Sequence, residues 1–200
     1  MNAESLEKWW FDQGDSTRCV NYDLNENSIV YDVGGWHGNW SSSIIAKYNP
    51  YVHIFEPIKA ACTILKERFM ENPKVQVHNF GLADRNAVAS INLSFDSSSI
   101  YTSGDSTEPI SLRDVAEVIV SPVDLLSINI EGGEYAMLER MLNSGAVKWC
   151  QNIQVQFHDF YPDCGKLRDE IRTRLSETHA ESYCYPFVWE SWRLKCLNPS

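Results

Sequence analysis

The sequence is short of positive charge. Its 200 residues include 17 Lys and Arg against 27 Asp and Glu, which gives a net charge of −10 at pH 7. Proteins that bind a nucleic-acid backbone usually present a basic face. The one basic cluster here, at residues 166–174, is interrupted by acids. The composition therefore argues against a nucleic-acid partner.

Long apolar runs are also missing. No stretch approaches the roughly 18 apolar residues that a membrane-spanning helix needs, and the polar N-terminus lacks the basic and apolar regions of a secretion signal. We therefore expect no membrane span and a cytoplasmic location. The sequence carries no indication of an oligomeric state.

Patterns of metal ligands and of disulfides are absent as well. The six cysteines form no CxxC pair, which disfavours a zinc site and favours reduced thiols. No HExxH is present, so no metal is implied. The cysteines stand at positions 19, 62, 150, 164, 184 and 196.

What the chain does have is an alternation of short apolar runs and longer amphipathic segments. This order predicts an α/β sandwich with a mostly parallel sheet, in a single domain of residues 1–200 whose first 27 residues form a helical extension. A polar loop is expected around Ser97–Ser99, Gly104 and Pro109. We expect strands at 28–33, 52–55, 75–80, 88–95, 123–130 and 153–157, helices at 4–12, 40–48, 58–70, 112–119, 131–143 and 167–179, and a hairpin at 182–197.

The first predicted strand runs into a glycine-rich turn, VYDVGGWHGNW, which contains Asp32, Gly34, Gly35 and Gly38. The spacing does not fit the dinucleotide fingerprint GxGxxG but reads DxGxxxG. An acid before the glycines repels a pyrophosphate and attracts an ammonium or sulfonium group. That charge pattern favours S-adenosylmethionine as the cofactor.

Two more acids follow the next predicted strands. Glu56 closes the second strand and is placed to accept hydrogen bonds from ribose hydroxyls, while Asp84 follows the third and could face an adenine amino group. Each acid also has a purely structural interpretation. Asp32 could be a turn carboxylate, Glu56 a solvated strand end, and Asp84 part of an Asx-turn with Asn86. Together, three acids after three successive strands favour a nucleoside site.

Four blocks in order resemble the FkbM family of S-adenosylmethionine-dependent methyltransferases: VYDVGGWHGNW, HIFEP, LLSINIEGGEYAMLERM and IQVQFHDF. The resemblance implies a Rossmann-like class I methyltransferase fold with a final antiparallel hairpin. It also implies O-methyl transfer, often to sugar hydroxyls of glycans or natural products. By the same resemblance, Asp32, Gly34 and Gly38 would hold the methionine part of the cofactor and Glu56 the ribose.

The chain departs from the family pattern KIDVEGAE at two positions, where Ser127 and Asn129 replace the usual lysine and aspartate. Asn129 can contact a cofactor through hydrogen bonds, but it cannot act as a carboxylate base. This departure favours, as an alternative, a cofactor-binding protein with lost or altered catalysis. A nicotinamide-dependent oxidoreductase is a further alternative, disfavoured by the missing GxGxxG.

Two residues are candidates for the base that removes the acceptor's proton. His158 follows the strand IQVQF and has an unperturbed pKa near 6.5, which suits proton transfer at neutral pH. It could equally be a structural histidine. Glu131 stands at a strand-to-helix junction, where it is either a base or a first-turn carboxylate favoured by the helix dipole. Glu134 fits the first-turn interpretation. The expected acceptor is a small molecule or glycan.

Overall fold

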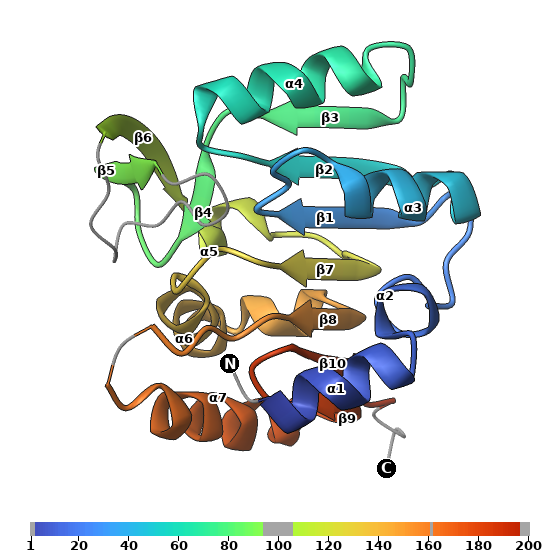
Figure 1. The fold of residues 1–200 in the computed structure, drawn as a ribbon, viewed down its shortest axis with the longest axis vertical. Coiled ribbons are helices and arrows are strands. Elements are labelled where there is room, and N and C mark those ends of the chain that lie inside the picture. Colours follow the sequence, from blue (N-terminus) through green and yellow to red (C-terminus); the bar gives the residue numbers. More distant parts are fainter. Residues whose placement is uncertain (1–2, 94–105, 161, 197–200) are drawn as a thin grey trace.

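The computed structural model describes residues 3–93, 106–160 and 162–196. Its centre is a seven-stranded sheet in the order β3-β2-β1-β7-β8-β10-β9, in which β10 alone runs against its neighbours β8 and β9 (Figure 1). This confirms the predicted α/β sandwich with a C-terminal hairpin. The strands are β1 (Ile29–Val33), β2 (Tyr51–Phe55), β3 (Val75–His78), β7 (Leu125–Ile128), β8 (Asn152–Val155), β9 (His179–Tyr185) and β10 (Trp189–Leu194).

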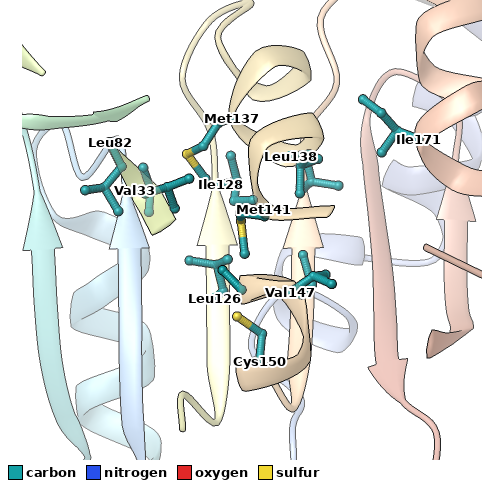
Figure 2. Packing of buried hydrophobic residues seen from close by; sticks show 14 of the residues in the cluster. Val33, Leu82, Leu126, Ile128, Met137, Leu138, Met141, Val147, Cys150 and Ile171 are labelled. Carbon is teal, nitrogen blue, oxygen red and sulfur yellow. The ribbon is translucent and has the colours of Figure 1, made fainter. Parts of the chain in front are cut away.

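Helices cover both faces of this sheet, which is why β7 and β8 are buried along their whole length. The helices α3 (Asn39–Tyr48) and α4 (Lys59–Phe69) enclose one apolar cluster with β1 and β2. On the other face, α6 (Glu134–Ser144) packs Met137, Leu138 and Met141 over Leu126 and Ile128 of β7 (Figure 2). The same cluster includes residues of α5 (Val115–Val118), the 3₁₀ helix η1 (Ala146–Trp149) and α7 (Cys164–Thr178).

The N-terminal segment forms α1 (Ala3–Phe11) and α2 (Gly14–Thr17), close to the helix expected at 4–12. Trp9 of α1 is buried against the hairpin, with its ring 5.1 Å from that of Tyr185. The extension therefore covers the β9–β10 end of the sheet.

A second, three-stranded sheet in the order β4-β6-β5 corrects two predictions. The strand expected at 75–80 ends at His78, after which the chain turns away and continues as a separate strand, β4 (Gly81–Ala83). The helix expected at 112–119 was wrong for its first residues, which belong to β6 (Ser106–Asp114), while β5 (Ala87–Leu93) matches the strand expected from 88. Asp114 ends the strand and caps α5 by accepting from the N–H of Ala116 at 2.9 Å.

The polar loop expected around Ser97–Ser99 and Gly104 lies outside the described residues, whereas Pro109 belongs to β6. Pro109 sits opposite Ser90 of β5, at a position where β4 does not pair with β6, and prolines in sheets are favoured at such one-sided positions. All six cysteines are free thiols. Within the described residues, no helix is long and apolar enough to cross a membrane.

Candidate active site

The predicted site residues come together at one edge of the main sheet. Asp32, Glu56, Asn129 and His158 stand at or just beyond the carboxyl ends of β1, β2, β7 and β8, which are parallel and end on the same side (Figure 1). The small sheet lies over this edge. In open α/β folds such an edge is where ligands bind.

Gly34 brings the glycine-rich turn into direct contact with the end of β7. Its φ is +88°, and a Cβ there would lie 1.9 Å from the backbone oxygen of Asn129, so only glycine fits. Added Cβ atoms at Gly35 and Gly38 would meet side chains of Ile54 and Phe69 at 2.2 and 2.7 Å. Close packing inside the protein therefore accounts for all three glycines. Their contact with a cofactor stays a prediction.

Asp32 points beneath the turn toward α3. Its side chain is buried, and the hydroxyl of Ser41 donates a hydrogen bond to Oδ2 at 2.5 Å. Burial raises the pKa of Asp32 to about 6, against the lowering effect of the Ser41 hydrogen bond. Asp32 thus ties β1 to α3 while remaining an acid that titrates close to neutrality.

Glu56 ties the turn to the end of β2. Its Oε2 accepts from the N–H of Trp36 at 2.9 Å and its Oε1 from the N–H of Ile58 at 2.8 Å. Burial raises the pKa of Glu56 to about 7, with smaller contributions from the charges of Asp32 and Glu108, while the two N–H groups lower it. Glu56 is therefore a buried carboxyl held by neutral donors.

A cavity of about 270 Å³ opens between the main-sheet edge and the small sheet. Its walls are mainly apolar and include Asp84, whose carboxylate pairs with Arg85 at 3.0 Å. Gly34 lines the cavity too, so the structure brings these two predicted residues to one space. Further lining residues that matter below are Phe55, Leu82, Ile130 and Gly133.

The loops after β7 and β8 form a second polar group, which we call the β7–β8 cluster: Glu131, Glu134 and His158. Nε2 of His158 lies 3.5 Å from Oε2 of Glu131, and its Nδ1 lies 3.2 Å from Oε1 of Glu134. Burial lowers the pKa of His158, but the two carboxylates outweigh this effect and raise it to about 9. A pKa raised to about 9 favours the cationic ring at neutral pH, a departure from the unperturbed value near 6.5 that the sequence could not indicate.

Sequence reasoning missed Glu134. The helix expected from 131 begins only at Glu134, because Glu131 and Gly132 have φ values of +50° and +104°. Glu134 is the first-turn acid of α6, as expected, but it is fully buried and accepts from the N–H of Gly132 at 2.8 Å and of His158 at 2.7 Å. The sequence feature that could have pointed to Glu134 is its place as the second acid of the EGGE segment.

Asn129 lies between the glycine-rich turn and the β7–β8 cluster. Its N–H donates to the carbonyl of Val33 at 2.9 Å, which continues the β1–β7 ladder by one residue. Its side-chain Oδ1 is buried and makes no hydrogen bond within the described residues. A buried acceptor without a donor is costly and is usually satisfied by a ligand or water. Asn129 therefore fits its predicted role as a cofactor contact.

Comparison with known proteins settles the family. A family model described as the methyltransferase FkbM domain matches residues 29–180. This chain belongs to the FkbM methyltransferase family. The match covers the glycine-rich turn, the EGGE segment and the HDF segment, so it confirms the resemblance seen in the sequence.

Solved structures agree with the FkbM assignment at the level of fold. The FkbM methyltransferase from Methylobacillus flagellatus KT gives a TM-score of 0.59 at 14% identity, over 86% of this chain and 44% of that chain. This chain thus spans less than half the length of that relative. A putative rRNA-methylase from Clostridium thermocellum gives 0.58 at 12% identity, over 95% of both chains. A putative RNA methyltransferase from Pyrococcus horikoshii gives 0.52 at 12% identity, over 98% of this chain and 84% of that chain. No curated protein sequence matches.

Proposed function

We propose that this FkbM-family protein uses S-adenosylmethionine to methylate a hydroxyl group of a sugar, glycan or other small molecule. The observation that carries the proposal is the adjacency of the cavity and the β7–β8 cluster. Ile130 and Gly133, which flank Glu131 and Gly132 in the chain, both line the cavity. The loop that carries Glu131 therefore forms part of the wall of the proposed nucleoside pocket.

The residues present fit the cofactor. The apolar walls at Phe55 and Leu82 suit a flat adenine ring, and Asp84 at the same cavity supplies an acceptor for its amino group. Each oxygen of Glu56 accepts one backbone hydrogen bond, and a carboxylate has capacity for about four, so ribose hydroxyls can be added. When bound, the cofactor supplies a methyl group already activated by a positive sulfur.

The protein's part in the reaction is to orient the acceptor and to remove its proton. Positioning alone can lower the barrier by roughly 7–11 kcal/mol in favourable cases, and a placed base adds about 10²–10⁴-fold. His158 and Glu131 are the groups proposed for this step. The acids of the cluster and the net charge of −10 favour a neutral acceptor over a polyanion.

Cofactor binding is tested by thermal unfolding with S-adenosylmethionine or S-adenosylhomocysteine. A ligand at 100 times its dissociation constant stabilises the folded state by about 2.7 kcal/mol. We expect both compounds to raise the melting temperature, and NAD, which tests the oxidoreductase alternative, to leave it unchanged. No shift at millimolar concentrations of either methionine compound would contradict the cofactor assignment.

The acceptor class is tested by following S-adenosylhomocysteine formation with a panel of methyl glycosides and, separately, with a structured RNA transcript. The RNA arm is needed because two of the similar structures are described as RNA methylases. We expect turnover with a glycoside and none with RNA. Turnover with RNA alone would overturn the small-molecule acceptor, and tight cofactor binding without any turnover would favour the non-catalytic alternative.

A further inference from the structure

Glu134 joins the two loops that carry the candidate catalytic groups. One oxygen accepts from the N–H of Gly132 in the loop after β7, and the other accepts from both the N–H and Nδ1 of His158 in the loop after β8. Its side chain is 0% exposed. A buried carboxylate without such partners would be costly. The hydrogen bonds of Glu134 to both loops therefore compensate its burial and fix the loops relative to each other.

Among the described residues, two charged groups face the His158 ring: Glu131 from the loop after β7 and Glu134 from α6, each at a different ring nitrogen. Phe160 has its ring 4.9 Å away, the Tyr135 hydroxyl donates to the His158 carbonyl at 2.6 Å, and Asp159 follows in the chain. With a carboxylate at both nitrogens, the ring is satisfied only when both carry a proton.

We propose that Glu134 is a positioning residue that fixes the His158 ring with Nε2 toward Glu131, and that Glu131 is therefore the catalytic residue that takes the acceptor's proton. This inference rests on the proposed function. In the step, the acceptor O–H bond breaks and an O–CH₃ bond forms. The electron pair of the carbon–sulfur bond stays on sulfur, and the proton moves to the Glu131 carboxylate.

Geometry and charge favour Glu131 over His158 for this role. A doubly protonated imidazole has no free lone pair, so it cannot accept a proton, but it can donate to Glu131 and hold that carboxylate in place. The Glu131 side chain is also 24% exposed against 8% for His158. Glu131 is therefore the more accessible of the two groups to an acceptor.

The positioning role is tested by NMR titration of the imidazole in the full-length protein without ligands. We expect His158 to titrate near pH 9 in the wild type, and more than one pH unit lower in Glu134→Gln, which keeps the size of the side chain but loses its charge. Glu139→Gln, an exposed change on the same helix, is the matched control and should leave the titration unchanged. A His158 titration near pH 6.5 in the wild type, or one unmoved by Glu134→Gln, overturns the role of Glu134.

The role of Glu131 is tested by the pH dependence of kcat with S-adenosylmethionine and a methyl glycoside that is turned over. We expect a plateau from pH 7 to 9, and a loss of about 10²–10⁴-fold in Glu131→Gln. A wild-type rate that climbs tenfold per pH unit up to pH 9, together with faster turnover at pH 7 in Glu134→Gln, would make His158 the base and overturn the assignment.

The NMR titration and the kinetic measurement also distinguish a failure of this inference from a failure of the proposed function. If the protein binds the cofactor but methylates no glycoside, the proposed acceptor class fails and the role of Glu131 falls with it. The NMR titration needs neither cofactor nor acceptor, so it still decides whether Glu134 positions His158.

Discussion

Two groups of acids lie at the same edge of the sheet, and their charges are compensated in opposite ways. The β1–β2 acids, Asp32 and Glu56, are held by a hydroxyl and by backbone N–H groups, all of them neutral. In the β7–β8 cluster, Glu131 and Glu134 share the cationic ring of His158. With neutral donors only, the pKa of a buried acid is raised toward neutral pH. A protonated histidine between two acids instead stabilises the charged form of their carboxylates.

The difference suggests a division of labour at the site. Any further donor to the β1–β2 acids would stabilise their charged form. The β7–β8 cluster already holds its charges and can take a proton without first losing one. Four predictions test this comparison, from the largest expected effect to the smallest.

Gly34→Ala should have the largest effect, because Gly34 is where the two groups meet. The new Cβ would lie 1.9 Å from the backbone oxygen of Asn129, and neither backbone can retreat without separating β1 from β7. We expect a loss of at least about 3 kcal/mol in the free energy of unfolding, measured with urea.

The matched control for this change is Gly145→Ala. Gly145 has a similar φ of +80°, but a Cβ there would meet nothing within 4 Å. Its cost should be only the left-handed backbone penalty of about 1–2 kcal/mol. Equal losses in the two variants would mean that the contact between Gly34 and Asn129 carries no special weight.

The second prediction concerns how stability depends on pH. Asp32 and Glu56 have raised pKa values of about 6 and about 7, so the folded state binds their protons more tightly than the unfolded state does. Stability should therefore fall as the pH rises from about 4 to 7, by at most about 3 kcal/mol for each acid. Asp32→Asn combined with Glu56→Gln should flatten the curve in this range.

The β7–β8 cluster should act in a different pH window. Because the pKa of His158 is raised from 6.5 to about 9, its contribution is complete below pH 6.5 and is lost as the pH rises through 9. Glu134→Gln should flatten this upper window and leave the lower one alone. Urea unfolding at pH values from 4 to 10 measures both, and a single shared window would contradict the comparison.

The sequence predicted the central sheet well because most of its strands are short, mainly apolar runs bounded by glycine, proline or polar residues. It failed at residues 112–119, where Leu112, Val115 and Ile119 have helical spacing but the first of them belongs to a strand of the small sheet. That strand exists because β4 and β5 pair with it, and pairing between distant segments leaves no local pattern.

The site residues were predicted by position, but their chemistry was not. The strand ends placed Asp32, Glu56 and His158 at one edge, because parallel strands all end on the same side. The role of Glu134 depends on positive φ values at Glu131 and Gly132, which redirect the chain before the helix starts. The charge of His158 depends on carboxylates from another loop, so no pattern around residue 158 could reveal it.

The third prediction is that Glu56→Gln weakens cofactor binding. The amide can still accept from one backbone N–H, but its nitrogen faces the other N–H and repels it. We expect at least a tenfold higher dissociation constant for S-adenosylhomocysteine by calorimetry, which is about 1.4 kcal/mol. Glu67→Gln, an exposed change on α4, is the control. In the wild type, affinity should also rise as the pH passes 7, because ribose hydroxyls favour the charged carboxylate.

The smallest effect is expected for Ser41→Ala at pH 5, where the change removes a side-chain donor from a neutral Asp32. Above the Asp32 pKa of about 6 this hydrogen bond is charge-assisted, and below it both partners are neutral. The loss of stability should therefore be about 1.5–3 kcal/mol at pH 8 and only about 0.5–1.5 kcal/mol at pH 5. Ser43→Ala, exposed on the same helix, should cost less than about 0.5 kcal/mol at both pH values. If the cost of Ser41→Ala were the same at pH 5 and pH 8, Asp32 would not titrate between them, and the contrast with the β7–β8 cluster would lose its basis.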